Sequence, residues 1–279
     1  MAGRKIVSYF EFDSDASTPL VLKVALSAVS VNGAMANLQA EATGKTFAGI
    51  ADEAWTQWNK ELEVVDVDGD EDAKTMFYTS LYHTMINPSV YMDVDGQYRG
   101  IDHSIHQAKG FTNYTVFSVW DTYRALHPLF NLINRERSAD IVNSMLAHYE
   151  QSVHKALPVW SHMGNENWCM IGYHSVSVAA DALNKGLTID KKKALEAMVN
   201  SSNVDYYDAT GEYKKYGYAP FDKNSNGSSI TLEYAYDDWT IYNTAKWMND
   251  NEIATAFAKR AQNYKNVFDP KLRFVRARN

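Results

Sequence analysis

Two different spacings of apolar residues follow one another along the chain. Aromatic and β-branched residues crowd positions 6–12, a turn-like segment covers 13–19, and apolar and polar residues alternate over 20–31. This pattern predicts two strands. Two strands do not form a stable sheet by themselves. We therefore interpret residues 1–32 as the tail of a β domain whose earlier strands lie outside this sequence, or else as strands that pack on the following helices.

From Gly33 onward the apolar residues recur every three or four positions, which is the period of a helix. We expect residues 33–69 to form a helical linker, with helices over 34–42 and 47–62 and a short strand over 64–67. Further helices are predicted in the rest of the chain, over 72–86, 115–132, 138–153, 170–185, 190–200, 230–249 and 251–268. The stretch 115–132 is apolar on most sides and is predicted to be a buried inner helix, whereas other predicted helices are amphipathic. This alternation predicts a two-layer helical barrel over residues 70–279.

Composition excludes several classes of protein. The formal net charge is −7 and the isoelectric point is near 5.6, which argues against nucleic acid or an anionic membrane surface as the main partner. No run of 18 uncharged apolar residues exists, so no membrane span is expected. The residues after Met1 do not contain the apolar core of a signal peptide. With the single cysteine Cys169, neither an internal disulfide nor a cysteine-based zinc site is possible.

The first candidate site combines Trp120 and Asp121 within a strongly apolar stretch. A carboxylate on a buried helix needs partners, and an indole beside it suits a sugar, whose apolar face stacks on the ring while the acid accepts hydroxyl hydrogen bonds. The alternative is a structural ion pair, because Asp121 and Arg124 are three residues apart on the predicted helix. Residue spacing alone leaves the two interpretations equal.

The second candidate is Glu166, which lies between Trp160 and Trp168 at the expected start of a helix. A helix N-terminus would favour its ionised form, whereas burial among aromatic rings would raise its pKa. The sequence does not decide between a general acid and a carboxylate that binds hydroxyls. The neighbouring Cys169 and His174 are five residues apart, so we favour a buried, inert thiol over a nucleophile pair.

Acidic segments elsewhere give weaker signals. Residues 66–72 and 93–95 are rich in Asp, but neither keeps the spacing of a calcium-binding loop. Residues 231–239 place paired acids beside Tyr and Trp at an expected helix start, which suits a carbohydrate cleft as well as an exposed first turn. Motifs of zinc proteases, nucleotide-binding loops and serine esterases do not occur.

Five segments in this order closely resemble the glycoside hydrolase family 92 α-mannosidases. They are FYTSLYH (77–83), DVDGQYRG (93–100), VFSVWDTYRALHP (116–128), GNENWCMIGYH (164–174) and LEYAYDDW (232–239). The resemblance implies a β-sandwich followed by an (α/α)6 barrel, so that this mainly α chain would contain the C-terminal remnant of the sandwich and an incomplete barrel. It also implies a calcium-dependent, inverting, exo-acting enzyme that removes α-linked mannose from glycans and is exported to the periplasm or medium.

The same resemblance assigns roles to residues. Matching the Trp-Asp-Thr-x-Arg motif, Trp120 and Asp121 would contact the mannose at the cleavage point, and Glu166 is a lesser candidate for lining the cleft. The segments that carry the family's general acid (EGNAWQY) and base (GNDDCG), and the NEPSHH stretch near its calcium, do not occur among the 279 residues. We therefore expect the catalytic acid and base to lie beyond Asn279, so that no catalytic residue is assigned within the chain.

An inverting enzyme needs both carboxylates. We therefore expect this polypeptide alone to be inactive and to hold no calcium ligands. The alternatives are a trehalase- or glucoamylase-like barrel glycosidase and a non-catalytic carbohydrate-binding module.

Overall fold

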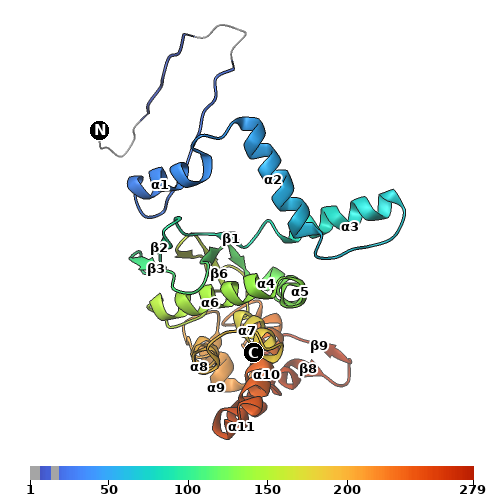
Figure 1. Cartoon of the computed structure of the whole chain (residues 1–279). Helices are drawn as coiled ribbons and strands as arrows, with labels where there is room; N and C mark the ends of the chain where they lie inside the picture. The colour runs from blue at the N-terminus through green and yellow to red at the C-terminus, as the bar shows by residue number, and fades with distance from the viewer. Residues whose placement is uncertain (1–6, 14–18) are drawn as a thin grey trace.

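The computed structural model describes residues 7–13 and 19–279 and is mainly helical (Figure 1). Three N-terminal helices stand at one end of the structure, and the remaining helices gather into a packed body. The helical fold class predicted from the sequence is confirmed. Residues 1–6 and 14–18, which include the start of the first predicted strand and most of the predicted turn, lie outside the described residues.

The two predicted N-terminal strands are not formed. The backbone over 7–13 and 19–30 has no strand, although its residues are aromatic and β-branched. A strand exists only through hydrogen bonds to a neighbour, and within the described residues these segments have no strand partner. The predicted strand over 64–67 is likewise wrong, since this stretch forms a turn and a bend before an extended segment.

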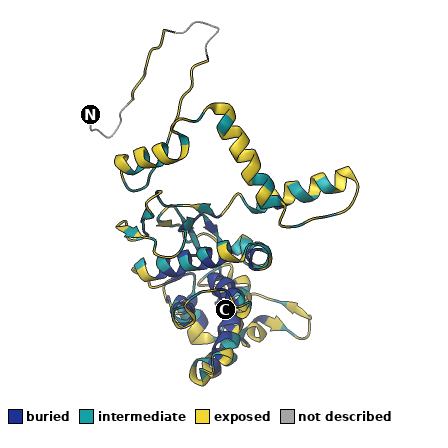
Figure 2. Cartoon of the chain, in the orientation of Figure 1, coloured by how far each residue is buried: buried dark blue, intermediate teal, exposed yellow. Residues whose placement is uncertain are grey.

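The N-terminal helices begin at side-chain caps, as helices in soluble proteins commonly do. They are α1 (Val31–Ala42), α2 (Phe47–Leu62) and α3 (Glu71–Thr84). Ser30, Thr46 and Asp70 each accept a hydrogen bond from a backbone N–H of the first turn. Within the described chain, α1 and α2 contain no buried residue, and Figure 2 shows them largely exposed.

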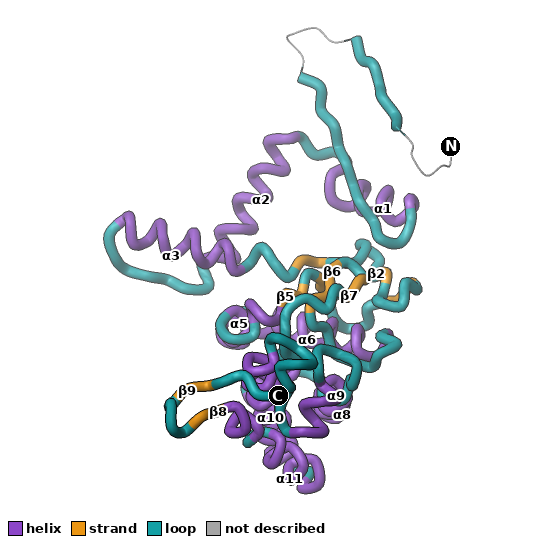
Figure 3. The backbone as a smooth tube through the Cα atoms, turned by 180° about the vertical axis from the view of Figure 1, so that it is seen from behind, coloured by secondary structure: helices purple, strands orange, loops and turns teal. Residues whose placement is uncertain are grey.

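Within the described residues, the short strands form four small sheets. Antiparallel pairs form between β1 (Ser89–Val90) and β4 (Tyr114–Thr115), between β2 (Gln97–Arg99) and β3 (Ile105–Gln107), and between β8 (Phe268–Asp269) and β9 (Phe274–Val275). A three-stranded sheet has the order β5 (Phe117–Ser118), β6 (Trp160–His162), β7 (Asn165–Glu166). Figure 3 shows β5, β6 and β7 grouped together at one side of the body.

The predicted inner helix over 115–132 is broken into several elements. Its first residues belong to β4 and β5, and Val116 between them has a left-handed φ of 68°. Two helices follow, α4 (Val119–Thr122) and α5 (Leu126–Ile133). Pro128 lacks an N–H and its ring would clash with the carbonyl four residues earlier, so one continuous helix cannot pass through this point.

The remaining helices pack around one core. They are α6 (Arg135–Gln151), α7 (Ser175–Asn184), α8 (Lys191–Ser201), α9 (Thr210–Tyr216), α10 (Gly227–Trp247) and α11 (Asn251–Arg260), followed by the 3-10 helix η1 (Asn263–Val267). The short α9 lacks an apolar period, and the sequence analysis missed it. Helix α7 begins later than predicted because Trp168, Met170 and Gly172 all have positive φ, which a helix cannot contain.

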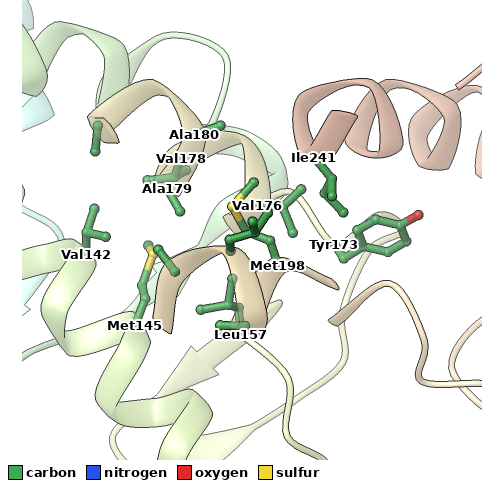
Figure 4. Close-up of a cluster of buried hydrophobic side chains, with 14 of the residues drawn as sticks. Val142, Met145, Leu157, Tyr173, Val176, Val178, Ala179, Ala180, Met198 and Ile241 are labelled. Carbon is green, nitrogen blue, oxygen red and sulfur yellow. The ribbon is translucent and has the colours of Figure 1, made fainter. Parts of the chain in front are cut away.

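The core lies between α6, α7, α8 and α10, as Figure 4 shows for part of it. Val142 and Met145 of α6 and Met198 of α8 are at most 1% exposed. The apolar face predicted over 138–153 is therefore buried as expected. No helix in the described residues is long and apolar enough to cross a membrane.

The C-terminal segment returns to the helical body after β9. The Phe221 N–H donates to the Arg278 carbonyl at 2.8 Å, and the Tyr218 hydroxyl donates to the carbonyl of Asn279 at 3.0 Å. The guanidinium of Arg278 also lies 4.5 Å from the ring centre of Tyr218. These contacts hold residues 278 and 279 beside the segment that joins α9 to α10.

Candidate functional site

A cavity of about 710 Å³ opens on the helical body where four segments meet. It is lined by residues from α4, from the loop after β7, from the loop before α9 and from α10: Trp120, Trp168, Met170, Ile171, Tyr206, Tyr207, Asp208, Asn226, Ser229 and Glu233. Aromatic faces with a few polar groups are typical of a small-molecule site. Two carboxylates and four large aromatic rings suit a ligand with apolar faces and many hydroxyls.

Trp120 lines this cavity, whereas its neighbour Asp121 has surroundings that differ from those expected. The guanidinium of Arg124 lies 4.8 Å from the Trp120 ring centre and 5.0 Å from that of Tyr123. Arg124 thus stacks on aromatic rings, and within the described chain Asp121 forms no ion pair with it. Asp121 is exposed and does not line the cavity. The predictions of a buried carboxylate and of a helix-face ion pair are both wrong, because α4 has only four residues and leaves this side open.

Glu166 lies on β7 rather than at a helix start, and it does not line the cavity. Its carboxylate, with a side chain 7% exposed, accepts hydrogen bonds from the backbone N–H groups of Val159, Trp160 and Trp168 at 2.8–3.0 Å. The nearby His148 Nε2 is 3.8 Å away. Burial lowers the pKa of His148 to about 4, so this imidazole is neutral at pH 7. Glu166 therefore holds the strand and the loop that presents Trp168.

The loop after β7 is fixed to the loop before α9. The Tyr207 hydroxyl donates to the Met170 carbonyl at 2.8 Å, and the Trp168 and Tyr207 ring centres are 5.0 Å apart. Burial raises the pKa of Tyr207 far above its ordinary value, so the hydroxyl keeps its proton. Cys169 on this loop is exposed, which corrects the expectation of a buried thiol.

A charged cluster behind the wall was only partly visible in the sequence. His174 Nδ1 lies 2.8 Å from Asp237 Oδ1, and Nε2 lies 2.7 Å from Oε2 of the cavity residue Glu233. Burial lowers the pKa of His174, but the two carboxylates outweigh this effect and raise it to about 9. The acids over 231–239 thus lie in the middle of α10 and not at a helix start, with Asp237 and Asp238 fully buried.

A second buried network supports α10 from the other side. The Nε–H of Arg260 donates to Asp238 Oδ2 at 3.0 Å, and Nη2 of Arg260 forms an ion pair with Oδ1 at 2.9 Å. The hydroxyls of Tyr173 and Tyr213 donate to the same carboxylate, each at 2.8 Å. Burial raises the pKa of Asp238 to about 6, although Arg260 and both hydroxyls act in the opposite direction. Both oxygens of Asp238 thus have partners within the protein, so we interpret this group as structural.

The described residues do not contain a metal site. Among residues 7–13 and 19–279, no group of three or more His, Cys, Asp or Glu side chains lies close enough together to hold a metal ion.

Known proteins resemble this chain over the segments that form the cavity. Residues 33–279 match the model of the glycosyl hydrolase family 92 catalytic domain. The chain is similar to the family GH92 α-mannosidase BT3965 from Bacteroides thetaiotaomicron, one of whose structures is a complex with mannoimidazole, with 48% identity and a TM-score of 0.88. It is also similar to the GH92 inverting mannosidase BT2199 of the same organism, with 32% identity and a TM-score of 0.84. Curated proteins gave no match.

These alignments cover 91% of this chain but only 33–35% of the two solved enzymes. The chain thus spans about a third of the length of the structures that it resembles. The family match decides against the trehalase- or glucoamylase-like alternatives. With a family model over most of its length and two solved relatives above 30% identity, the chain belongs to glycoside hydrolase family 92.

Proposed function

We propose that this chain forms part of the sugar-binding wall of an inverting exo-α-mannosidase, and that the aromatic cavity binds the terminal α-linked mannose of a glycan. The observation that carries the proposal is the cavity itself, where Trp120, Trp168 and Glu233 come from three of the segments that resemble the family. Indole faces pack against the apolar face of a pyranose, and carboxylates accept its hydroxyl hydrogen bonds. The solved relatives, of which one binds mannoimidazole and one is an inverting mannosidase, support the same substrate and stereochemistry.

A binding experiment tests this directly. Isothermal titration of the chain with methyl α-mannoside should give measurable heat, and Trp168→Ala should weaken the affinity about tenfold or more, in line with the energy of a stacked aromatic contact. Trp247→Ala is the matched control, because Trp247 lies at the end of α10, away from the cavity lining. Equal effects of both substitutions would contradict a specific sugar contact in the cavity.

Hydrolysis is a separate part of the proposal. Inverting cleavage needs a general acid and a general base on opposite sides of the bond. The family segments expected to carry them do not occur up to Asn279. We therefore expect this polypeptide alone to release no mannose from α-mannosides, with or without added calcium, while still binding the sugar. Release of mannose by the isolated polypeptide would overturn this expectation. If the polypeptide also fails to bind the sugar, a structural role is favoured instead.

We propose that only the longer enzyme requires calcium. We expect the calcium ligands to lie outside this chain, so calcium should leave the thermal unfolding temperature of the 279-residue polypeptide unchanged. An increase in that temperature with calcium, but not with magnesium, would show that this chain contributes ligands after all. Export to the periplasm or medium remains a proposal from the family resemblance, and cell fractionation tests it.

The candidate residues receive different roles within the proposal. Trp120 would contact the mannose through its ring, and Asp121 is retained from its match to the family motif although it lies outside the cavity lining. In an enzyme of full length, Asp121→Ala should reduce kcat/KM about a hundredfold without lowering the unfolding temperature. Glu166 acts through Trp168, so its replacement should lower both stability and sugar affinity.

A further inference from the structure

A buried histidine connects the core to one carboxylate of the cavity wall. His174 is the residue before α7, and its side chain is 1% exposed. It contacts Asp237, which is fully buried, and Glu233, whose side chain is 22% exposed and lines the cavity. Glu233 and Asp237 are one helical turn apart on α10, so both carboxylates face the same imidazole.

The imidazole ring has a closely fitted environment. The Tyr123 ring stacks on it with ring centres 4.0 Å apart and planes 12° from parallel. Gly172 has a φ of 86°, and a Cβ at this position would lie 2.3 Å from His174 Nε2. Only glycine therefore leaves room for the ring. The Tyr173 N–H donates to the second oxygen of Asp237 at 2.8 Å and fixes that carboxylate.

The charges around His174 are mostly negative. Facing it are the carboxylates of Asp237 and Glu233 and the phenol rings of Tyr123 and Tyr236. At neutral pH the ring is an imidazolium, since burial is outweighed by the two carboxylates and the pKa is raised to about 9. The Nε2–H does not point straight at Glu233, so this contact is an ion pair and not a well-aligned hydrogen bond.

We propose that His174 is a positioning residue, which holds the Glu233 carboxylate at a fixed place in the cavity wall so that it accepts hydrogen bonds from sugar hydroxyls. This inference rests on the proposed function. A merely structural ion pair would stabilise the fold without affecting sugar affinity. A positioning role also requires that the charge on His174 depends on Glu233.

The first experiment measures that dependence without any sugar. Nitrogen-15 NMR of the imidazole groups follows the titration of His174 in the whole chain. Glu233→Gln should lower its midpoint by about one pH unit or more, because one of its two carboxylate partners becomes neutral. Asp208→Asn, which removes the other cavity carboxylate, should leave the midpoint unchanged. An unchanged midpoint in Glu233→Gln would overturn the positioning role.

The second experiment measures affinity for methyl α-mannoside. His174→Gln and Gly172→Ala should each weaken binding about tenfold or more. His127→Gln is the matched control, since His127 is also fully buried but does not line the cavity. Unchanged affinity in a folded His174→Gln chain would overturn the inference. Absence of binding by the unsubstituted chain would instead overturn the proposed function, and the NMR measurement separates these two failures.

Discussion

Glu166 was a lesser candidate for lining the cleft, but its carboxylate bonds to the backbone and does not line the cavity. Its position between two tryptophans suggested a sugar contact. The structure shows a carboxylate that satisfies three backbone N–H groups around β6 and β7. Residue types alone do not reveal which donors a carboxylate meets, because those donors come from the local path of the backbone.

This assignment predicts a stability effect. Glu166→Ala leaves buried N–H groups without an acceptor and should lower the free energy of unfolding by about 3 kcal/mol in urea denaturation. Glu150→Ala removes only an exposed partner of Lys193 and should cost less than about 1 kcal/mol. Equal losses in the two variants would contradict a structural role for Glu166.

The buried histidines predict how stability depends on pH. Burial lowers the pKa of His127 and His148 to about 4, below the ordinary 6.5 of the unfolded chain. Their effect is therefore a loss of stability as the pH falls from about 6.5 toward 4. His174 has a raised pKa of about 9, so its stabilisation is complete below pH 6.5 and is lost as the pH rises through 9.

Stability attributable to these groups should therefore be highest at about pH 6.5 to 7. Each histidine contributes a change on the order of 3 kcal/mol across its window. Urea unfolding at a series of pH values measures this, and His174→Gln should flatten only the alkaline side of the curve. A loss of the acidic slope in that variant would contradict the assignment.

At the scale of elements, helices with a regular apolar period were predictable and irregular ones were not. The predicted helix over 47–62 matches α2 at both ends, since Thr46 provides a cap and the apolar period is unbroken. The prediction of one helix over 115–132 is wrong. Val116 has a left-handed φ, and Pro128 cannot continue a helix that begins several residues earlier. The apolar character of this stretch was identified correctly, but its burial comes from several short elements.

The N-terminal helix α1 is tied to the loop before β2 by a buried carboxylate. Asp93 accepts hydrogen bonds from Ser27 Oγ at 2.7 Å and from Asn37 Nδ2 at 2.8 Å. Asp93→Ala should detach α1 and increase hydrogen exchange and proteolytic cleavage over residues 27–42. Asp95→Ala is the control, because its carboxylate accepts from the neighbouring Gln97 and does not contact α1 among the described residues. Increased exchange in both variants would argue against a specific tether.

At the scale of the whole molecule, apolar surface is distributed very unevenly. The helical body contains the buried apolar core, whereas the N-terminal part exposes most of its large apolar side chains (Figure 2), for example Phe10 at 80%, Phe47 at 79% and Trp55 at 71%. Large exposed apolar surfaces mark contacts with other protein surfaces. The polypeptide should therefore bind a hydrophobic dye and self-associate in light scattering. Replacing Phe47 and Trp55 by Ser should reduce both signals, and a monomer that binds no dye would contradict this.

The family and the helical architecture could be predicted from the sequence because long family motifs occur in order along it. The cavity could be predicted only in part. Trp120 could be predicted from its motif. The role of Glu233 depends on His174, which lies far earlier in the sequence and contacts Glu233 only through the packing of α7 against α10. Such tertiary contacts have no periodic signal in the sequence.

Indole NMR during a titration with methyl α-mannoside tests the central claim most directly, because it locates the sugar as well as detecting it. The indole signals of Trp120 and Trp168, assigned by substitution with Phe, should shift together and saturate. Those of Trp55 and Trp247, which lie outside the cavity lining, should stay in place. Saturating shifts at Trp55 or Trp247 alone, or no shift at any indole, would contradict a mannose-binding wall in this cavity.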